Sequence, residues 1–276
     1  MGRSGAPSVT PADNALAAEV QGAIGAVRMA PDGTLVVAFT TGQVFTVGSD
    51  ERLHALADAR TWAPTGDKDL RDLVIGTDGA IYLADAVTHS VWRWRTGVAT
   101  RFAGTGLEAP LGAVVVGPAN ALPLHTPEGL AFGPDGSLYI TEHGAHRVRR
   151  VAPDGSMTLF AGTGADGCRG GLLGASAPAG AVSTLVPLCH PKAVVVSRQG
   201  VVYFSQQHRI NAIADGRMTD IAGNERASAR CVALHDGIQI NPGPEVWGCI
   251  HAPSGLELTP AGELLAVGEE GGGYPG

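Results

Sequence analysis

Three histidines stand directly before short apolar stretches, in the segments LHTPEGL, LCHPKAV and IHAPSGL, and they are His125, His190 and His251. Neutral imidazole is the commonest protein ligand for zinc and other transition metals, so a ring of such side chains could bind a metal. The register is imperfect, because His190 lies one residue before its proline and Cys189 takes the matching place. The metal set that this register allows is therefore His125, Cys189 and His251, with Cys189 as a reduced thiol.

The cysteines favour another arrangement. All four lie in two long connections, and each connection holds one pair. We predict disulfides Cys168–Cys189 and Cys231–Cys249, each closing a loop and stabilising the fold by about 3 kcal/mol. Disulfides persist in oxidising compartments, so this pairing predicts an extracytoplasmic or secreted protein. The alternative is four reduced thiols in a cytosolic protein. No cofactor is favoured, although zinc or calcium remains open.

Motifs for covalent catalysis are absent from the sequence. It contains no G-x-S-x-G, no H-E-x-x-H and no G-x-x-x-x-G-K-[ST]. Acidic residues in the long connections could take part in acid–base chemistry, but nothing in the sequence pairs them; these are Glu108, Asp166, Glu225 and Asp236. The sequence therefore leans away from an enzyme.

Short strands with turn signals recur along the chain. Residues 126–164 spell four strands separated by two Pro-Asp-Gly turns and one looser loop. Gly136 supplies the positive φ that the first turn needs. Weaker copies follow the same order, and the repeats span about 22–56, 69–106, 126–164, 190–224 and 253–276, the last stopping after two strands. Repetition with a period of tens of residues predicts a propeller or a solenoid.

The pattern P-x-G-L-A, then PDG-x-L-Y, H-R-[VI] and AGTG, resembles the NHL repeat family. The resemblance implies an all-β, NHL-type β-propeller with six blades, incomplete here, with four full repeats and a partial fifth. Residues 1–276 would be one propeller domain or a fragment of one, the alternative being an open ring covered by a partner. In related amidating lyases the zinc-binding histidine follows the proline directly, where this chain has Glu128, Lys192 and Ser254. That activity is therefore not expected.

A blade of four antiparallel strands sends its inter-blade connections and its second-to-third loops to one face. We call this the insertion face, and it carries residues 107–125, 165–189 and 225–251. Histidines at matching places before the third strand, namely His89, His146 and His208, predict a structural role in which each bridges its own loop. Insertions in repeat folds tend to carry function. The candidate ligand-binding residues on this face are His125, Glu128, His190, Lys192 and His251.

Composition limits the partners. The net charge of −7 argues against nucleic acid, which needs phosphate-neutralising Lys and Arg. No stretch approaches the roughly 18 consecutive apolar residues of a membrane helix, so we expect no membrane insertion. One basic run, Arg147, Arg149 and Arg150, alternates along a strand and predicts a solvated outer face.

Three function classes fit these observations. The first is a non-enzymatic binding or scaffold module, extracytoplasmic, that recognises a protein, peptide or glycan through the insertion face. The second is a metal-dependent lyase or hydrolase acting at the channel mouth. The third is a spacer segment of a large secreted or toxin-like protein.

Overall fold

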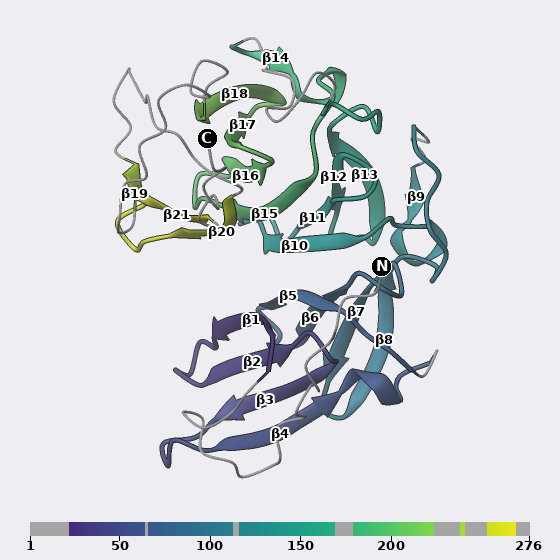
Figure 1. Ribbon diagram of the computed structural model, residues 1–276, viewed down its shortest axis with the longest axis vertical. Coiled ribbons are helices and arrows are strands. Elements are labelled where there is room, and N and C mark those ends of the chain that lie inside the picture. Colours follow the sequence, from purple (N-terminus) through teal and green to yellow (C-terminus); the bar gives the residue numbers. More distant parts are fainter. Residues whose placement is uncertain are drawn as a thin grey trace, which may run out of the picture.

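The protein is described by a computed structural model, which covers residues 22–63, 66–112, 116–168, 179–223, 238–240 and 253–268. It is an all-β molecule whose antiparallel sheets follow one another around a common centre (Figure 1). This confirms the predicted all-β, propeller-type fold. The predicted disulfide Cys231–Cys249 and the candidate residue His251 lie outside the described residues.

Each of the first four sheets, here called blades, runs outward from its first strand. The first blade contains β1 (Ile24–Met29), β2 (Leu35–Phe39), β3 (Gln43–Val47) and β4 (Leu53–Asp58). The second contains β5 (Leu70–Ile75), β6 (Ile81–Asp85), β7 (Ser90–Arg95) and β8 (Val98–Ala103). The third contains β10 (Pro127–Phe132), β11 (Leu138–Glu142), β12 (Arg147–Val151) and β13 (Ser156–Ala161). The fourth contains β15 (Pro191–Val196), β16 (Val202–Gln206), β17 (Arg209–Ala214) and β18 (Arg217–Ala222).

The remaining elements come from connections. Two-residue strands β9 (Gly117–Pro118) and β14 (Ala181–Val182) pair with the outer edges of the third and fourth blades. Single 3-10 turns follow β4, β9 and β14, and they are η2 (Ala59–Thr61), η3 (Ala119–Ala121) and η4 (Ser183–Leu185) respectively. The fifth sheet has the order β19-β21-β20, from β19 (Ile238–Ile240), β20 (Pro253–Leu258) and β21 (Leu264–Gly268). The strand β19, which pairs with the outer side of β21, thus comes before the fifth repeat in the chain.

The Asp-Gly turns form as the sequence predicts. Gly136 has φ 77°, and the carboxylate of Asp135 accepts a hydrogen bond from the Ser137 backbone N–H at 3.0 Å. The second blade repeats the arrangement, with the Asp78 carboxylate accepting from Ala80 N–H at 3.0 Å. These side-chain contacts mimic a backbone turn and fix the register of the hairpin. The turns therefore place the opposite ends of the strands, and the long connections, on the insertion face.

Apolar cores lie between successive blades and hold them in order. Tyr82 of β6 packs with Leu130 and Leu138 of the third blade. Tyr139 of β11 in turn belongs to a cluster with Phe204 of β16. Burying a large apolar side chain stabilises a fold by about 1.5–3 kcal/mol. The inner strands β6 and β11 are consequently covered on both faces by neighbouring blades.

This packing corrects the expectation for the basic run. Arg147 and Arg149 are only 1% exposed. The Nε atom of Arg147 lies 2.5 Å from a Glu142 carboxylate oxygen, and that of Arg149 lies 3.8 Å from the same oxygen. Only Arg150 reaches solvent, where it pairs with Asp135 at 2.8 Å. The predicted solvated face is therefore wrong for the first two residues, because β12 is enclosed between blades.

No helix in the described part of the chain is long and apolar enough to cross a lipid bilayer.

Candidate functional site

The innermost strands β1, β5, β10, β15 and β20 gather at the centre of the molecule (Figure 1). The second residue of three consecutive innermost strands carries a charge, and these residues are Arg71, Glu128 and Lys192. We call them the central cluster. Arg71 Nη1 lies 3.9 Å from Glu128 Oε1. Burial raises the pKa of Glu128, while the charges of Arg71 and Lys192 act to lower it. Two of the predicted ligand-face residues, Glu128 and Lys192, thus lie together.

Asp72, the residue after Arg71, adds a buried charge that contacts both neighbouring innermost strands. The sequence analysis did not identify this residue as a site candidate. Its carboxylate accepts a hydrogen bond from Arg28 Nη2 of β1 at 2.8 Å and another from Leu130 N–H of β10 at 2.9 Å. Burial raises the pKa of Asp72 to about 6, Arg28 acts to lower it, and Glu257 acts to raise it. The available signal was a charge at a position where the other innermost strands carry small residues, namely Ala26, Gly129, Ala193 and Gly255.

At the junction of the second and third blades, His89 contacts the next blade. Its Nδ1 accepts a hydrogen bond from Thr126 N–H at 3.1 Å, directly before β10. His125, one residue earlier, has its N–H bonded to Glu142 Oε1 at 2.8 Å. Its Nε2 lies 3.0 Å from Glu108 Oε1, and its ring centroid is 5.7 Å from that of His89. The sequence showed Glu108 as an isolated acid, whereas the fold pairs it with histidine.

The His125 ring is held closely at this junction. A side chain at Gly144 would place its Cβ 2.4 Å from a His125 ring atom, so any larger residue there would have to displace the ring. The Nδ1 atom of His125 is buried and has no hydrogen-bond partner among the described residues. Burial lowers the pKa of His89, and the neighbouring His125 lowers it further.

The junction of the third and fourth blades repeats this scaffold with different side chains. His146 Nδ1 accepts a hydrogen bond from His190 N–H at 3.3 Å, directly before β15. Cys189 N–H donates to Gln206 Oε1 at 2.7 Å, as His125 N–H donates to Glu142 at the previous junction. Cys189 therefore occupies the place equivalent to His125, as the sequence indicated. Its sulfur is bonded to Cys168, with 4.8 Å between the Cα atoms, which confirms this predicted disulfide.

These hydrogen bonds also refine the role of the repeated histidines. His89 and His146 are structural, but each reaches the first strand of the following blade and not its own loop. The expected partner was wrong because the second-to-third loop lies over the start of the neighbouring innermost strand. His89 and His146 have φ of 46° and 50°, left-handed values that turn the ring across the junction.

Three imidazoles meet at the second junction. The rings of His143 and His190 stack with centroids 4.3 Å apart, and those of His146 and His190 lie 4.5 Å apart. His190 Nδ1 lies 3.3 Å from the His143 carbonyl oxygen. Burial, followed by the charges of His190 and Lys192, lowers the pKa of His143 to about 4. Burial likewise lowers the pKa of His146. His143 and His146 are therefore neutral at pH 7.

Metal-ligating atoms also meet here. One ligand atom each of His146, Cys168 and His190 lies within 4.8 Å of the others. This set differs from the sequence-based set of His125, Cys189 and His251. In the structure His125 and Cys189 belong to successive junctions, each with its own partner. With Cys168 in a disulfide, its sulfur offers no thiolate to a metal.

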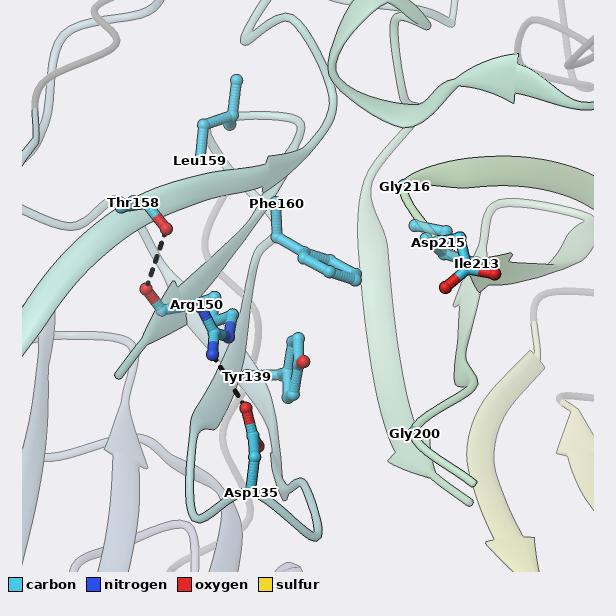
Figure 2. A pocket seen from close by; sticks show the side chains of 10 residues that line it. All are labelled: Asp135, Tyr139, Arg150, Thr158, Leu159, Phe160, Gly200, Ile213, Asp215 and Gly216. Atoms are coloured by element: carbon cyan, nitrogen blue, oxygen red, sulfur yellow. Dashed lines mark hydrogen bonds and ion pairs between the residues drawn. The ribbon is translucent and has the colours of Figure 1, made fainter. Parts of the chain in front are cut away.

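A separate cavity of about 360 Å³ lies between the third and fourth blades (Figure 2). Tyr139 and Phe160 stand on one side of it, with Ile213 and Asp215 on the other. Four of its lining positions belong to Asp-Gly or Gln-Gly turns, at Asp135, Gly200, Asp215 and Gly216. It therefore opens on the turn side, away from the candidate ligand-binding residues.

The sequence matches no protein-family model and no curated protein. The fold does have similar solved structures. A gluconolactonase from Xanthomonas campestris matches with a TM-score of 0.54 and 19% identity, covering 88% of this chain and 68% of that one. Virginiamycin B lyase from Staphylococcus aureus matches with a TM-score of 0.51 and 14% identity, covering 91% and 71%.

An auxiliary nutrient binding protein from Bacteroides thetaiotaomicron matches with a TM-score of 0.51 and 18% identity, covering 67% of this chain. This chain spans 45% of the length of that protein. At these identities the likeness shows the propeller-type fold alone. Binding proteins and enzymes both occur among the similar structures, so function must be argued from the site.

Proposed function

We propose that this chain is a non-enzymatic binding or scaffold module that recognises a protein, peptide or glycan through the insertion face. The observation that carries the proposal is the central cluster. Arg71, Glu128 and Lys192 stand at the same position of three neighbouring strands, on a sheet scaffold that holds their backbone rigidly. A few convergent charged groups on a rigid scaffold are what orients a polar ligand in a binding site.

The balance of charge favours a ligand with an acidic group. Arg71 contacts two carboxylates, because its Nη2 lies 2.5 Å from Asp69 Oδ2 and its Nη1 lies 3.9 Å from Glu128 Oε1. Lys192 acts on Glu128 through its charge but takes part in no close ion pair among the described residues. An acidic peptide side chain or an acidic sugar would supply the missing partner for Lys192. Charge-assisted hydrogen bonds of this kind are stronger than neutral ones.

The neighbouring histidines favour binding over catalysis. His89 and His146 each use Nδ1 to accept a backbone N–H, and such a nitrogen is not free to act as a base. The alternative, a metal-dependent lyase or hydrolase at the channel mouth, is favoured by one observation, the 3.0 Å contact between His125 and Glu108.

The proposed scaffold is an NHL-type propeller with six blades, formed by residues 1–276 alone or within a longer chain. Its disulfide supports an extracytoplasmic location.

The test is a binding screen with variants on two faces. Labelled protein is applied to arrays of neutral and acidic oligosaccharides and of acidic and basic peptides. Variants Arg71→Ala and Lys192→Ala remove central charges. Arg95→Ala is the matched control, because this exposed arginine lies at a turn on the opposite side of the second blade.

We expect acidic probes to bind and each central variant to weaken the affinity about tenfold or more, the scale of one charge-assisted hydrogen bond. The Arg95→Ala control should bind like the unmodified protein. Binding that ignores both central variants would contradict the proposal. Turnover of a bound probe would favour the lyase or hydrolase, and a folded chain that binds no probe would favour the spacer segment.

A further inference from the structure

The junction of the third and fourth blades assembles metal-type ligands from three separate segments. His146 ends the β11–β12 loop, Cys168 lies in the connection after β13, and His190 precedes β15. Their ligand atoms lie within 4.8 Å of one another. Thiolate and imidazole together are the ligands that zinc prefers in proteins. Residues so distant in sequence meet here only because the two blades pack against each other.

The hydrogen bonds around His190 suit a metal ligand. A carbonyl oxygen can only accept, so the 3.3 Å contact between His190 Nδ1 and the His143 carbonyl places the proton on Nδ1. The lone pair of Nε2 is then free. Metal-bound histidines characteristically donate their other ring N–H to a carbonyl or carboxylate, which fixes the tautomer and the ring orientation.

His146 needs one rearrangement. Its Nδ1 accepts a hydrogen bond from His190 N–H, so the neutral ring carries its proton on Nε2. Ligation through either nitrogen requires that this hydrogen bond be given up or that the proton move. At 3.3 Å the hydrogen bond is long, and its loss is a small change beside the gain of a zinc–imidazole bond.

The disulfide supplies two further ligands when it is opened. Cys168 and Cys189 are bonded to each other, so reduction releases two thiols side by side. Two thiolates on one tetrahedral zinc ion, with Zn–S of about 2.3 Å, lie roughly 3.8 Å apart. Both sulfurs can therefore enter one coordination shell with little movement of the chain, whose Cα atoms are 4.8 Å apart.

We propose that reduction of the Cys168–Cys189 disulfide converts this blade junction into a zinc site with His146, Cys168, Cys189 and His190 as ligands. The reductant is a dithiol, which gives two electrons and two protons to the disulfide and is itself oxidised to a disulfide. The two thiols then release their protons to solvent as zinc binds, giving a neutral Cys₂His₂ centre. Disulfide and zinc would join the same two segments in the two redox states.

The previous junction supplies the control. Its equivalents of Cys189 and His190 are His125 and Thr126, and Pro110 stands at the place of Cys168. The scaffold is the same but it holds no thiol. A metal that bound merely to clustered histidines would show no dependence on the cysteines, whereas the proposed site depends on both.

The experiment uses the full chain with Cys231→Ser and Cys249→Ser, so that only Cys168 and Cys189 contribute thiols. Cobalt(II) is the probe, because thiolate ligation gives a charge-transfer absorption band. Oxidised protein should bind no cobalt. Protein reduced with a phosphine or dithiol, with the excess reductant removed in the absence of air before titration, should bind one cobalt per chain, and one equivalent of zinc should displace it. His190→Ala should weaken binding at least tenfold, whereas Thr126→Ala should leave it unchanged.

Reduction could also unfold the chain, which circular dichroism detects. In that case stoichiometric zinc should restore the fold, and failure to do so would overturn the proposal. Cys189→Ser gives a second route, since it frees Cys168 without a reductant and keeps three ligands, so weaker cobalt binding is expected. A folded reduced protein that binds no cobalt would overturn the proposal. So would binding that persists in the double variant Cys168→Ser and Cys189→Ser.

Discussion

At the junction of the second and third blades, His125 contacts the carboxylate of Glu108, whereas at the next junction its equivalent, Cys189, is covalently bonded to Cys168. Around these contacts the backbone scaffold is the same, because in both places a buried amide or carboxylate oxygen accepts the N–H of this residue. A histidine from the preceding blade bonds the following N–H in both. The backbone arrangement of the two junctions is therefore the same, and the side chains determine whether the contact across each junction is covalent or non-covalent.

The second difference concerns charge. The loop of the third blade carries His143 where the second blade has Ala86, and His190 stands where the previous junction has Thr126. The later junction therefore buries a group of imidazoles against Lys192 and Arg71, whose charges help to lower the pKa of His143. We expect this junction to be the more sensitive of the two to reduction and to acid.

The largest effect should come from removing the covalent link. Replacing Cys168 and Cys189 together by serine reopens a loop with a sequence separation of 21. This should lower the free energy of unfolding by about 3 kcal/mol, because the unfolded chain regains conformational freedom. Urea unfolding of variant and unmodified protein measures it. A loss under 1 kcal/mol would mean that the disulfide stabilises its junction little more than the non-covalent contact stabilises the previous one.

Acid should weaken the later junction next. The folded state lowers the pKa of His143 from 6.5 to about 4, so between these values it binds fewer protons than the unfolded chain. The free energy of unfolding should therefore fall as the pH drops from 6.5 to 4, by about 2 kcal/mol for this group, because its partial exposure to solvent screens part of the effect. His143→Asn should flatten this part of the curve, measured by urea unfolding at several pH values. An unchanged slope would locate the acid sensitivity elsewhere.

The equivalent histidines His89 and His146 should contribute similar, smaller amounts to stability at the two junctions. His89→Ala and His146→Ala each leave a backbone N–H without its acceptor, at Thr126 and His190 respectively. Each should lower the free energy of unfolding by about 1–3 kcal/mol, the usual penalty for an unsatisfied buried donor. Thermal unfolding of the two variants compares them directly. If only one variant is destabilised, the equivalent hydrogen bonds at the two junctions do not contribute equally to stability.

The smallest effect should come from Glu108. Its side chain is 61% exposed, so its contact with His125 is screened by water. Glu108→Gln should change the free energy of unfolding by less than about 1 kcal/mol, as exposed ion pairs usually do. Differential scanning calorimetry at pH 7 measures this. A larger loss would show that the non-covalent junction is fastened far more firmly than its exposure suggests.

The sequence by itself determined the blades. Alternating apolar residues and the Asp-Gly turns are local signals, so the hairpins around Gly79 and Gly136 follow from residues only a few positions apart. The pairing of Cys168 with Cys189 was also readable, because both lie at the ends of one connection. The equivalence of Cys189 and His125 followed from their spacing to the next proline.

Only the tertiary structure decided what crosses between blades. His89 and Thr126 are 37 residues apart, and His146 and His190 are 44 apart, so their contacts depend on how two finished sheets pack. The same packing buried Arg147 and Arg149, brought Asp72 under the β10 backbone, and placed Glu108 beside His125. A strand's pattern specifies which face is apolar but not which neighbour covers it. Contacts between blades are therefore fixed only when the ring of sheets assembles.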